Sequence, residues 1–296
     1  MSTDAAAETA LPKLSIIISC RNSEPTLAET LESIAAQDYP HWWELVVVDN
    51  GSTDRTAEVA RTFAGRIPNL RVIRPPVPGH QGHGVNHGIE HSTGEAIVFL
   101  DSDDVIGTDY LLHMGRAMTT HGFVGARVDI DLLNPPAVRA RRRMLQSTGI
   151  DTYSRFRPAA IGAAMGARRD ALEAVGRMDE DLPTQLDIDV SWRMAAKGYP
   201  TVFVPAAVLH YRYRTTPKDI FKQERGYGVG SVALYRKFRP EGMPGRSILQ
   251  IGADLARLLV GLRELRTEGG RARIATMAGQ IVGRLEGSIK YRTRYL

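Results

Sequence analysis

The segment Ala96-Ile97-Val98-Phe99-Leu100-Asp101-Ser102-Asp103-Asp104 decides the fold of this chain. Five consecutive apolar residues without polar alternation predict a strand that is covered on both faces. Three carboxylates follow at once, and like charges destabilise one another unless a cation or strong donors lie among them. The segment therefore predicts a buried strand that ends in a site for a hard divalent metal. Capping of the next helix by residues 102–104 is the structural alternative.

Similar apolar runs lie upstream and alternate with segments of helical spacing. Strands are expected at residues 14–19, 44–48 and 70–73, and helices are expected to end near residues 37, 60 and 91. This alternation predicts an α/β fold with a doubly wound, mainly parallel sheet. In such a sheet the carboxyl ends of the strands line the binding crevice. Three polar segments should converge there: residues 19–22, 49–54 and 101–104.

Composition excludes several classes of protein. The 296 residues are 43% hydrophobic and 24% charged, as in ordinary globular proteins. Cys20 is the only cysteine, so no disulfide can form within the chain and a cytoplasmic location is expected. Residues 1–11 lack the pattern of a signal peptide and are expected to form a loose tail. No apolar run reaches the roughly 18–20 residues that span a bilayer.

Much of the net charge of +5 lies after Gly245, in a segment with helical spacing. An apolar stripe runs along one face of this segment; it consists of Ile248, Ile251, Leu255, Leu258, Leu259 and Leu262. Such a helix could pack on the core, form a homodimer, or lie peripherally on the inner face of an anionic membrane. Interrupting acidic residues and glycines favour packing or dimerisation. No nucleic-acid-binding module is recognisable, so no nucleic-acid partner is expected.

Three segments resemble, in order and separation, the hallmark stretches of family-two glycosyltransferases of the GT-A fold: residues 15–22, 46–54 and 99–104. Asn86-His87-Gly88-Ile89, Thr93-Gly94-Glu95, Arg168-Arg169 and residues 176–180 extend the resemblance over about residues 12–215. It implies a GT-A domain over 12–215, with a nucleotide-sugar half at about 12–104 and an acceptor half at about 105–215. A helical C-terminal extension at 216–296 follows.

The resemblance implies an inverting transfer from a nucleoside diphosphate sugar, by default a UDP-sugar, to an acceptor hydroxyl with Mn²⁺ or Mg²⁺. Asp49 would contact the nucleoside, Asp101 the ribose, and Asp103 the metal. The other substrate-binding residues that it implies are Ser19, Cys20, Arg21 and Asn22, through their backbone, together with Asn86 and Gly162.

The resemblance also supplies a catalytic base, because an inverting transfer needs a group that takes the acceptor's proton. Asp187 occupies that position, although Leu186 replaces the acidic residue that precedes it in the family. Asp189 is interpreted as a helix cap, and initiation of a helix by both aspartates is the alternative. His210 is a second predicted metal ligand, suited to Mn²⁺, with a packed surface role as the alternative. Residues 223–227 loosely resemble an element that grips the diphosphate.

Two further clusters favour simpler interpretations. His80, His83, His87 and His91 are interpreted as structural or acceptor-lining, because no third ligand completes a closed zinc site. Residues 139–143 carry four arginines that could meet a phosphorylated acceptor, although a solvated face is the commoner explanation.

Two other functions stay open on the sequence. A sugar nucleotidyltransferase should carry a glycine-rich loop after the first strand, and residues 19–22 lack one. A non-catalytic nucleotide-sugar or carbohydrate-binding protein is favoured slightly by Leu186. For the enzyme, the acceptor could be a saccharide, a lipid-linked glycan or a small-molecule aglycone.

Overall fold

The structure, a computed structural model, describes residues 10–141 and 145–296. Most of the predicted N-terminal tail and the middle of the arginine cluster, Arg142 and Arg143, lie outside these residues.

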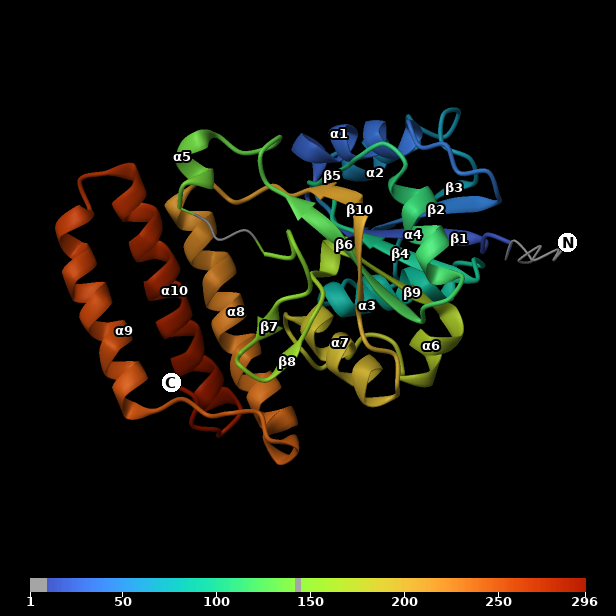
Figure 1. Cartoon of the computed structure of the whole chain (residues 1–296). Coiled ribbons are helices and arrows are strands. Elements are labelled where there is room, and N and C mark those ends of the chain that lie inside the picture. The colour runs from blue at the N-terminus through green and yellow to red at the C-terminus, as the bar shows by residue number, and fades with distance from the viewer. Residues whose placement is uncertain (1–9, 142–144) are drawn as a thin grey trace, which may run out of the picture.

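The described residues form an eight-stranded sheet at the centre of the molecule, in the order β3-β2-β1-β4-β9-β6-β10-β5 (Figure 1). Its strands are β1 (Leu14–Cys20), β2 (Trp43–Asp49), β3 (Leu70–Ile73), β4 (Ala96–Leu100), β5 (Val105–Ile106), β6 (Phe123–Asp129), β9 (Met165–Arg168) and β10 (Val202–His210). A small hairpin, β7 (Thr152–Tyr153) and β8 (Arg157–Pro158), lies outside this sheet.

The predicted, mainly parallel sheet is confirmed. β1 runs parallel to β2 and β4, and β3 is parallel to β2, while β9 and β5 run antiparallel to their neighbours. In register, Cys20 lies opposite Asp49, and Ile18 lies opposite Leu100. The segments that follow β1, β2 and β4 therefore meet at one edge of the sheet.

Alternating residues of the buried strands feed two apolar layers. Ile16, Ile18 and Val98 pack with α1 (Glu24–Ala35), α2 (Thr56–Arg61) and α4 (Tyr110–Met118) on one face. Ile17, Ile97 and Phe99 pack with α3 (Gln81–Glu90), α6 (Arg169–Ala174) and α7 (Leu186–Ala196) on the other. Figure 1 shows α1 and α2 above the sheet and α6 and α7 below it. Burial on both faces explains the strands' continuous apolar sequences.

The predicted C-terminal helical extension is also confirmed. It contains α8 (Pro217–Phe238), α9 (Ile248–Gly261) and α10 (Glu268–Lys290), joined through the 3₁₀ turns η2 (Arg239–Glu241) and η3 (Leu262–Glu264). α5 (Pro136–Arg139) and η1 (Gly162–Ala164) complete the short helices. The Trp192 ring of α7 meets the Phe238 ring of α8 edge-on at 4.9 Å. This aromatic contact attaches the extension to the core.

Glycines let α8 and α10 approach closely. Gly279, Gly283 and Gly287 are buried and lie four residues apart on one face of α10. A Cβ atom at Gly283 would lie 2.0 Å from the Arg225 carbonyl oxygen of α8. Because a backbone atom occupies that space, the contact tolerates no side chain without a shift of one helix.

We expect Gly283→Ala to lower the free energy of unfolding by about 1–3 kcal/mol through overpacking. Gly252→Ala in α9 is the matched control, because a Cβ there meets nothing within 4 Å. It should instead raise stability by about 0.5–1 kcal/mol. Urea unfolding measures both, and equal behaviour of the two variants would contradict the α8–α10 packing.

Candidate active site

The acidic segment after β4 forms a compact cluster. One carboxylate oxygen from each of Asp101, Asp103 and Asp104 lies within 4.8 Å of the others. Desolvation, with the charges of Asp103 and Asp187, raises the pKa of Asp101 to about 7. Desolvation and the charges of Asp103 and Asp101 raise the pKa of Asp104 well above its usual range. The protein alone therefore does not fully offset the negative charge gathered here.

The described cations of the cluster come from the link between β10 and α8. Arg214 Nη1 lies 2.9 Å from Asp103 Oδ2. The backbone N–H of Arg212 donates to Asp104 Oδ1 at 2.7 Å, and its Nε donates to the Asp103 carbonyl at 2.8 Å. Asp104 Oδ2 is buried without a hydrogen-bond partner among the described residues. A crowded set of oxygen donors with an orphaned carboxylate oxygen fits a hard divalent cation such as Mg²⁺ or Mn²⁺.

His210 ends β10 opposite Val105, close to the acidic segment. Its Nδ1 lies 3.0 Å from Asp129 Oδ1. A carboxylate in this place orients an imidazole so that Nε2 can act as a ligand. His210 does not belong to the group whose ligand atoms lie within 4.8 Å of one another, so its metal-binding role stays a prediction.

Asp187 lies in the first turn of α7, where backbone donors hold its carboxylate. Gly162 N donates to Oδ2 at 2.9 Å, and Ile188 N donates to Oδ1 at 3.0 Å. Desolvation raises the pKa of Asp187 despite these bonds. Gly162, predicted to bind substrate, contacts the predicted base directly. The neighbouring Leu186 is buried against α3, where a Cβ at Gly82 would lie 3.2 Å from its Cδ2.

The interpretation of Asp189 as a helix cap is wrong. Gln185 is the N-cap residue of α7, and the Asp189 side chain is fully buried. It pairs with Arg193 at 2.7 Å and with Lys237 of α8 at 2.6 Å. Because two cations engage this carboxylate inside the protein, Asp189 is a structural ion pair between α7 and α8 rather than a substitute base.

The predicted nucleoside end is held together by hydrogen bonds between the segments after β1 and β2. Asp49 is buried, with Oδ1 accepting from Ser52 N at 2.8 Å and Oδ2 from Arg74 Nη2 at 2.5 Å. Although burial opposes it, these contacts lower the pKa of Asp49. Asn22 adopts a left-handed backbone, and its Oδ1 accepts from Thr53 N at 2.8 Å. The two segments therefore form one rigid rim.

Within residues 19–22 the side chains differ in whether they are accessible to a ligand at the edge of the sheet. The Cys20 thiol is buried and lies 3.5 Å from the Val48 carbonyl, and burial raises its pKa to about 12. Its side chain faces the core, so only its backbone is available at the edge. Ser19 lies against α3, where a Cβ at Gly84 would come within 2.2 Å of its Oγ. Arg21 is exposed.

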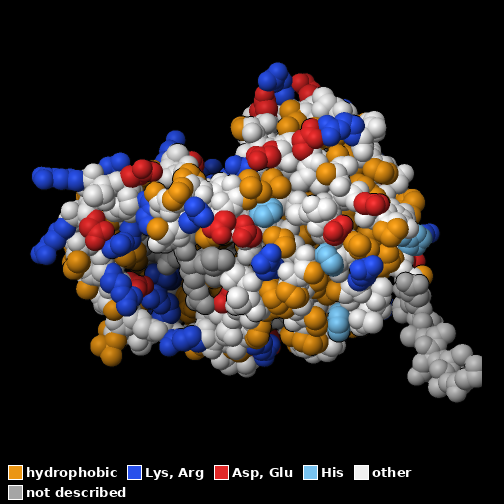
Figure 2. Space-filling view, turned by 45° about the horizontal axis from the view of Figure 1, so that its top comes forward, with side chains coloured by type: hydrophobic (Ala, Val, Ile, Leu, Met, Phe, Trp, Pro, Cys, Tyr) orange, Lys and Arg blue, Asp and Glu red, His pale blue; other side chains and the backbone are white. Residues whose placement is uncertain are grey.

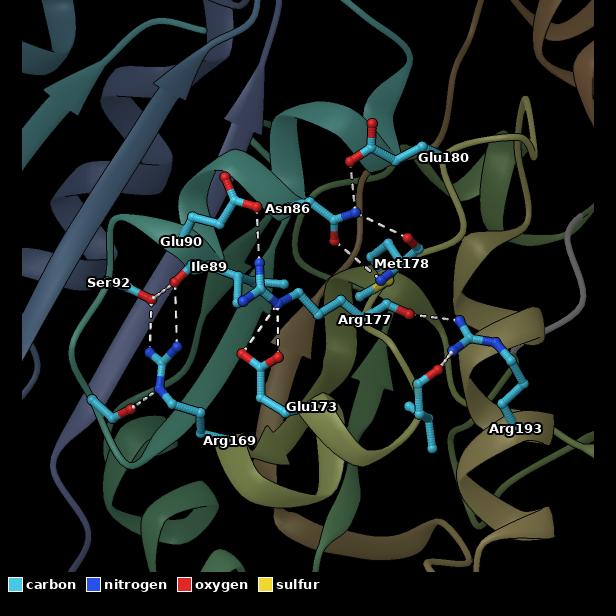
Figure 3. Close-up of polar contacts among 12 residues, drawn as sticks. Asn86, Ile89, Glu90, Ser92, Arg169, Glu173, Arg177, Met178, Glu180 and Arg193 are labelled. Carbon is cyan, nitrogen blue, oxygen red and sulfur yellow. Dashed lines mark hydrogen bonds and ion pairs between the residues drawn. The ribbon is translucent and has the colours of Figure 1, made fainter.

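Asn86 hydrogen-bonds within the protein, and its predicted substrate contact stays a prediction. Its Nδ2 donates to the Met178 carbonyl at 2.9 Å and to Glu180 Oε1 at 2.8 Å, and its Oδ1 accepts from Met178 N at 3.1 Å (Figure 3). Both amide hydrogens are thus used inside the protein. Asn86 positions the segment that leads to α7.

Arginines extend this connection between the two halves of the domain (Figure 3). Arg169 donates to Ser92 Oγ at 2.8 Å and to the Ile89 carbonyl at 3.2 Å. Arg177 pairs with Glu90 of α3 and with Glu173 of α6, each at 2.9 Å. Together with Asn86, these contacts fasten α3 to the segment that carries Asp187.

The four-residue histidine pattern has partners of its own. His83 Nδ1 lies 2.9 Å from Glu180 Oε2, and His91 Nδ1 lies 2.8 Å from the His87 carbonyl. His87, Glu90 and His91 could approach one ion, but Glu90 already pairs with Arg177. The structural interpretation of these histidines stays a prediction.

Arg214 lies at the acidic cluster and was not named by the sequence analysis, whereas Tyr227 belongs to the predicted element at residues 223–227. The Tyr227 ring on α8 is desolvated, and the charges of Asp187 and Asp101 raise its pKa further. The alternation His210-Tyr211-Arg212-Tyr213-Arg214 after a strand was the available signal for Arg214. Within residues 223–227, Arg225 pairs with Glu286 of α10 at 2.7 Å, and the diphosphate contact of this element stays a prediction.

A cavity of about 310 Å³ opens beside Arg214, between α5 and the first turns of α8 and α10. Arg141 and Arg273 also line it, with Ile220 and Met277 supplying apolar wall. Arg141 has no carboxylate partner among the described residues, whereas Arg273 pairs with Glu264 at 3.0 Å. The cavity therefore combines positive charge with an apolar lining, next to the acidic cluster.

Two family descriptions match the chain. Residues 15–176 match Glycosyl transferase family 2, and residues 96–280 match Glycosyl transferase family group 2. The poly-beta-1,6-N-acetyl-D-glucosamine synthase of Staphylococcus epidermidis is 26% identical over 241 residues, which are 77% of this chain and 57% of that protein. Glycosyltransferase AglE of Haloferax volcanii is 28% identical over 228 residues, or 76% of this chain and 75% of that protein. The chain thus spans little more than half the length of the staphylococcal synthase.

Solved structures share the fold. The mannosyltransferase PcManGT from Pyrobaculum calidifontis, in complex with GDP-Man and Mn²⁺, superposes with a TM-score of 0.68 at 21% identity, covering 94% of this chain and 88% of that one. S. aureus TarS in complex with UDP-GlcNAc superposes with a TM-score of 0.54 at 19% identity, covering 96% of this chain and 93% of that one. At such identities the likeness shows the architecture alone.

We expect Asn86→Ala to lower the free energy of unfolding by about 1–3 kcal/mol, because it leaves the buried Met178 backbone unpaired. Affinity for nucleotide should stay within a few-fold. His83→Ala is the control: it removes another contact to Glu180, but an exposed one worth less than about 1 kcal/mol. Urea unfolding and nucleotide calorimetry give both readouts. Unchanged stability with a tenfold loss of affinity would favour the substrate contact.

Proposed function

The chain belongs to glycosyl transferase family 2, and we propose that this glycosyltransferase moves a sugar from a nucleoside diphosphate sugar to an acceptor hydroxyl with inversion at the anomeric carbon. One observation carries the proposal. The metal-suited cluster after β4 and the carboxylate of Asp187 lie close enough for the charge of Asp187 to raise the pKa of Asp101. Donor activation and proton removal thus share one crevice.

For the donor, the proposal places the base and ribose at the rim formed by residues 19–22, Asp49 and Asp101. UDP is the first choice of carrier, with GDP as the alternative. TarS with UDP-GlcNAc and PcManGT with GDP-Man show both carriers on this fold. The exposed Arg74, which engages Asp49, lies at this rim and is available to a nucleotide.

Asp103 and Asp104, with His210 as a further ligand, would hold Mn²⁺ or Mg²⁺. When bound, such an ion offsets charge that develops on the departing diphosphate. Arg214 occupies the neighbourhood of Asp103 and can contact the same diphosphate, because its guanidinium is half exposed. The chain therefore brings two kinds of positive charge to the leaving group.

Asp187 would accept the acceptor's hydroxyl proton while the oxygen attacks the anomeric carbon opposite the diphosphate. Gly162 N–H and Ile188 N–H fix the direction of the carboxylate. Desolvation strengthens it as a base, since the pKa of Asp187 is raised. Because Leu186 supplies no second carboxylate, Asp187 would work alone.

For the acceptor, the cavity lined by Arg141, Arg214 and Arg273 suits a molecule with a negatively charged group. A lipid-linked or phosphorylated saccharide fits this description better than a neutral sugar. A nucleotidyltransferase is disfavoured by family membership and by the missing glycine-rich loop.

We expect Asp187→Asn to reduce turnover by roughly 10² or more, because an amide keeps the two hydrogen bonds but cannot take the proton. Donor affinity by calorimetry should stay within a few-fold. Asp181→Asn, an exposed aspartate on the same segment, is the matched control and should keep full turnover. Near-normal turnover of Asp187→Asn would overturn the assignment of the base.

We expect Asp103→Asn to abolish the gain in nucleotide affinity that Mn²⁺ produces, because it removes a carboxylate of the cluster. Calorimetry with UDP and with GDP, each with and without Mn²⁺, measures the gain and identifies the carrier. The exposed Asp38→Asn serves as control. An Asp103 variant that keeps the Mn²⁺-dependent gain would remove Asp103 from the metal site.

A further inference from the structure

Asp254 of α9 attaches this helix to the rest of the protein through ion pairs. The helix forms the outer edge of the extension, with α10 lying between it and α8 (Figure 1). Gly261 is its one buried residue. Asp254 pairs with Arg246 at 2.5 Å and with Arg284 of α10 at 3.0 Å, and both arginines are largely buried. These largely buried ion pairs therefore help to orient this helix.

Several large apolar residues of α9 point away from the protein, whereas Ile251 and Leu258 are half-buried. Leu249 is 84% exposed, Ile248 73%, Leu259 66% and Val260 61%. The sequence analysis favoured packing or dimerisation of this stripe; Leu249, Leu259 and Val260 do not pack on the core, whereas dimerisation stays a prediction. An amphipathic helix whose apolar side chains remain in water marks a contact surface.

Positive charge surrounds this surface. Residues 246–296 contain ten Lys or Arg and four Asp or Glu. The net charge of this segment, ten minus four or +6, is larger than the net charge of +5 of the whole chain. Arg257 is 72% exposed beside the apolar residues, and Arg263 and Arg266 are exposed just beyond α9. Figure 2 shows Lys and Arg side chains gathered over the helical extension, with apolar side chains among them. The partner should thus be negative as well as apolar.

We propose that α9 docks the protein on an anionic phospholipid surface, with Ile248, Leu249, Leu259 and Val260 entering the headgroup boundary. Leucine-rich faces flanked by arginine bind such surfaces through buried apolar area and attraction to lipid phosphates. A second copy of the chain fits less well, because a symmetric contact would oppose one arginine-rich face to its equal. None of the described helices is both long and apolar enough to cross a bilayer, so docking would be peripheral.

Co-sedimentation of the full-length protein with vesicles tests the proposal. We expect binding to vesicles that contain phosphatidylglycerol, weak binding to pure phosphatidylcholine, and weakening at high salt. Leu249→Glu with Val260→Glu should reduce binding at least about tenfold, since both side chains would leave the lipid and their charge would be repelled. Both residues are exposed, so folding should be unaffected.

Val77→Glu with Leu132→Glu is the matched control, because it places the same two charges on apolar side chains that are 70% and 62% exposed outside the extension. It should retain vesicle binding. Wild-type protein that stays unbound, or equal loss in both double variants, would overturn the proposal. Light scattering that shows a dimer dissociated by Leu249→Glu with Val260→Glu, without vesicle binding, would assign the face to a second copy instead. These readouts need no activity, so they are independent of the proposed transfer reaction.

Discussion

Crowding of three carboxylates at the end of β4 is the constraint on which the rest of the structure depends. β4 lies between β1 and β9 inside the sheet, so the acidic segment cannot move to open solvent without loss of the core. The cluster must be offset where it stands. Arg212 and Arg214, more than one hundred residues downstream, offset part of the negative charge of the cluster. The end of β10 and the start of α8 are thereby bound to the same point.

A second requirement is that the separation between the proposed base, Asp187, and the acidic cluster stay fixed. Asp187 belongs to α7, whereas the nucleotide rim belongs to the first three strands of the chain. Asn86 and Arg169 bridge the two halves through buried or half-buried hydrogen bonds, and Arg177 does so through an exposed ion pair with Glu90. Because reacting groups lose efficiency with small displacements, such a brace is as relevant to catalysis as to stability. The brace also explains why α3 carries a polar residue such as Asn86, which the sequence analysis interpreted as a substrate contact.

The C-terminal extension shows two modes of attachment in one element. α8 and α10 join through glycines at backbone distance, and α8 joins the core through the Trp192 and Phe238 rings. Among the described residues, α9 has neither close backbone packing at glycines nor an aromatic contact of this kind, and the ion pairs of Asp254 hold it. Asp254 faces the protein, while several large apolar residues of the helix face outward, unlike those of an ordinary surface helix. The extension is thus firmly fixed on one side and presents a contact surface on the other.

The sequence by itself determined the first four strands, the acidic edge, the family and the helical extension, because each depends on local periodicity or on motifs within a few residues. Buried strands carry their apolar runs wherever they pack, and Asp101 to Asp104 follow one of them directly. Only the tertiary structure decided which polar side chains already bind another residue of the protein. Asn86 is committed to Met178, Asp189 to Lys237, and Arg225 to Glu286, and each partner lies far away along the chain. Helical spacing likewise revealed the apolar stripe of α9 but not the exposure of Ile248, Leu255 and Leu259, because burial of a helix face depends on which elements pack against it in the fold.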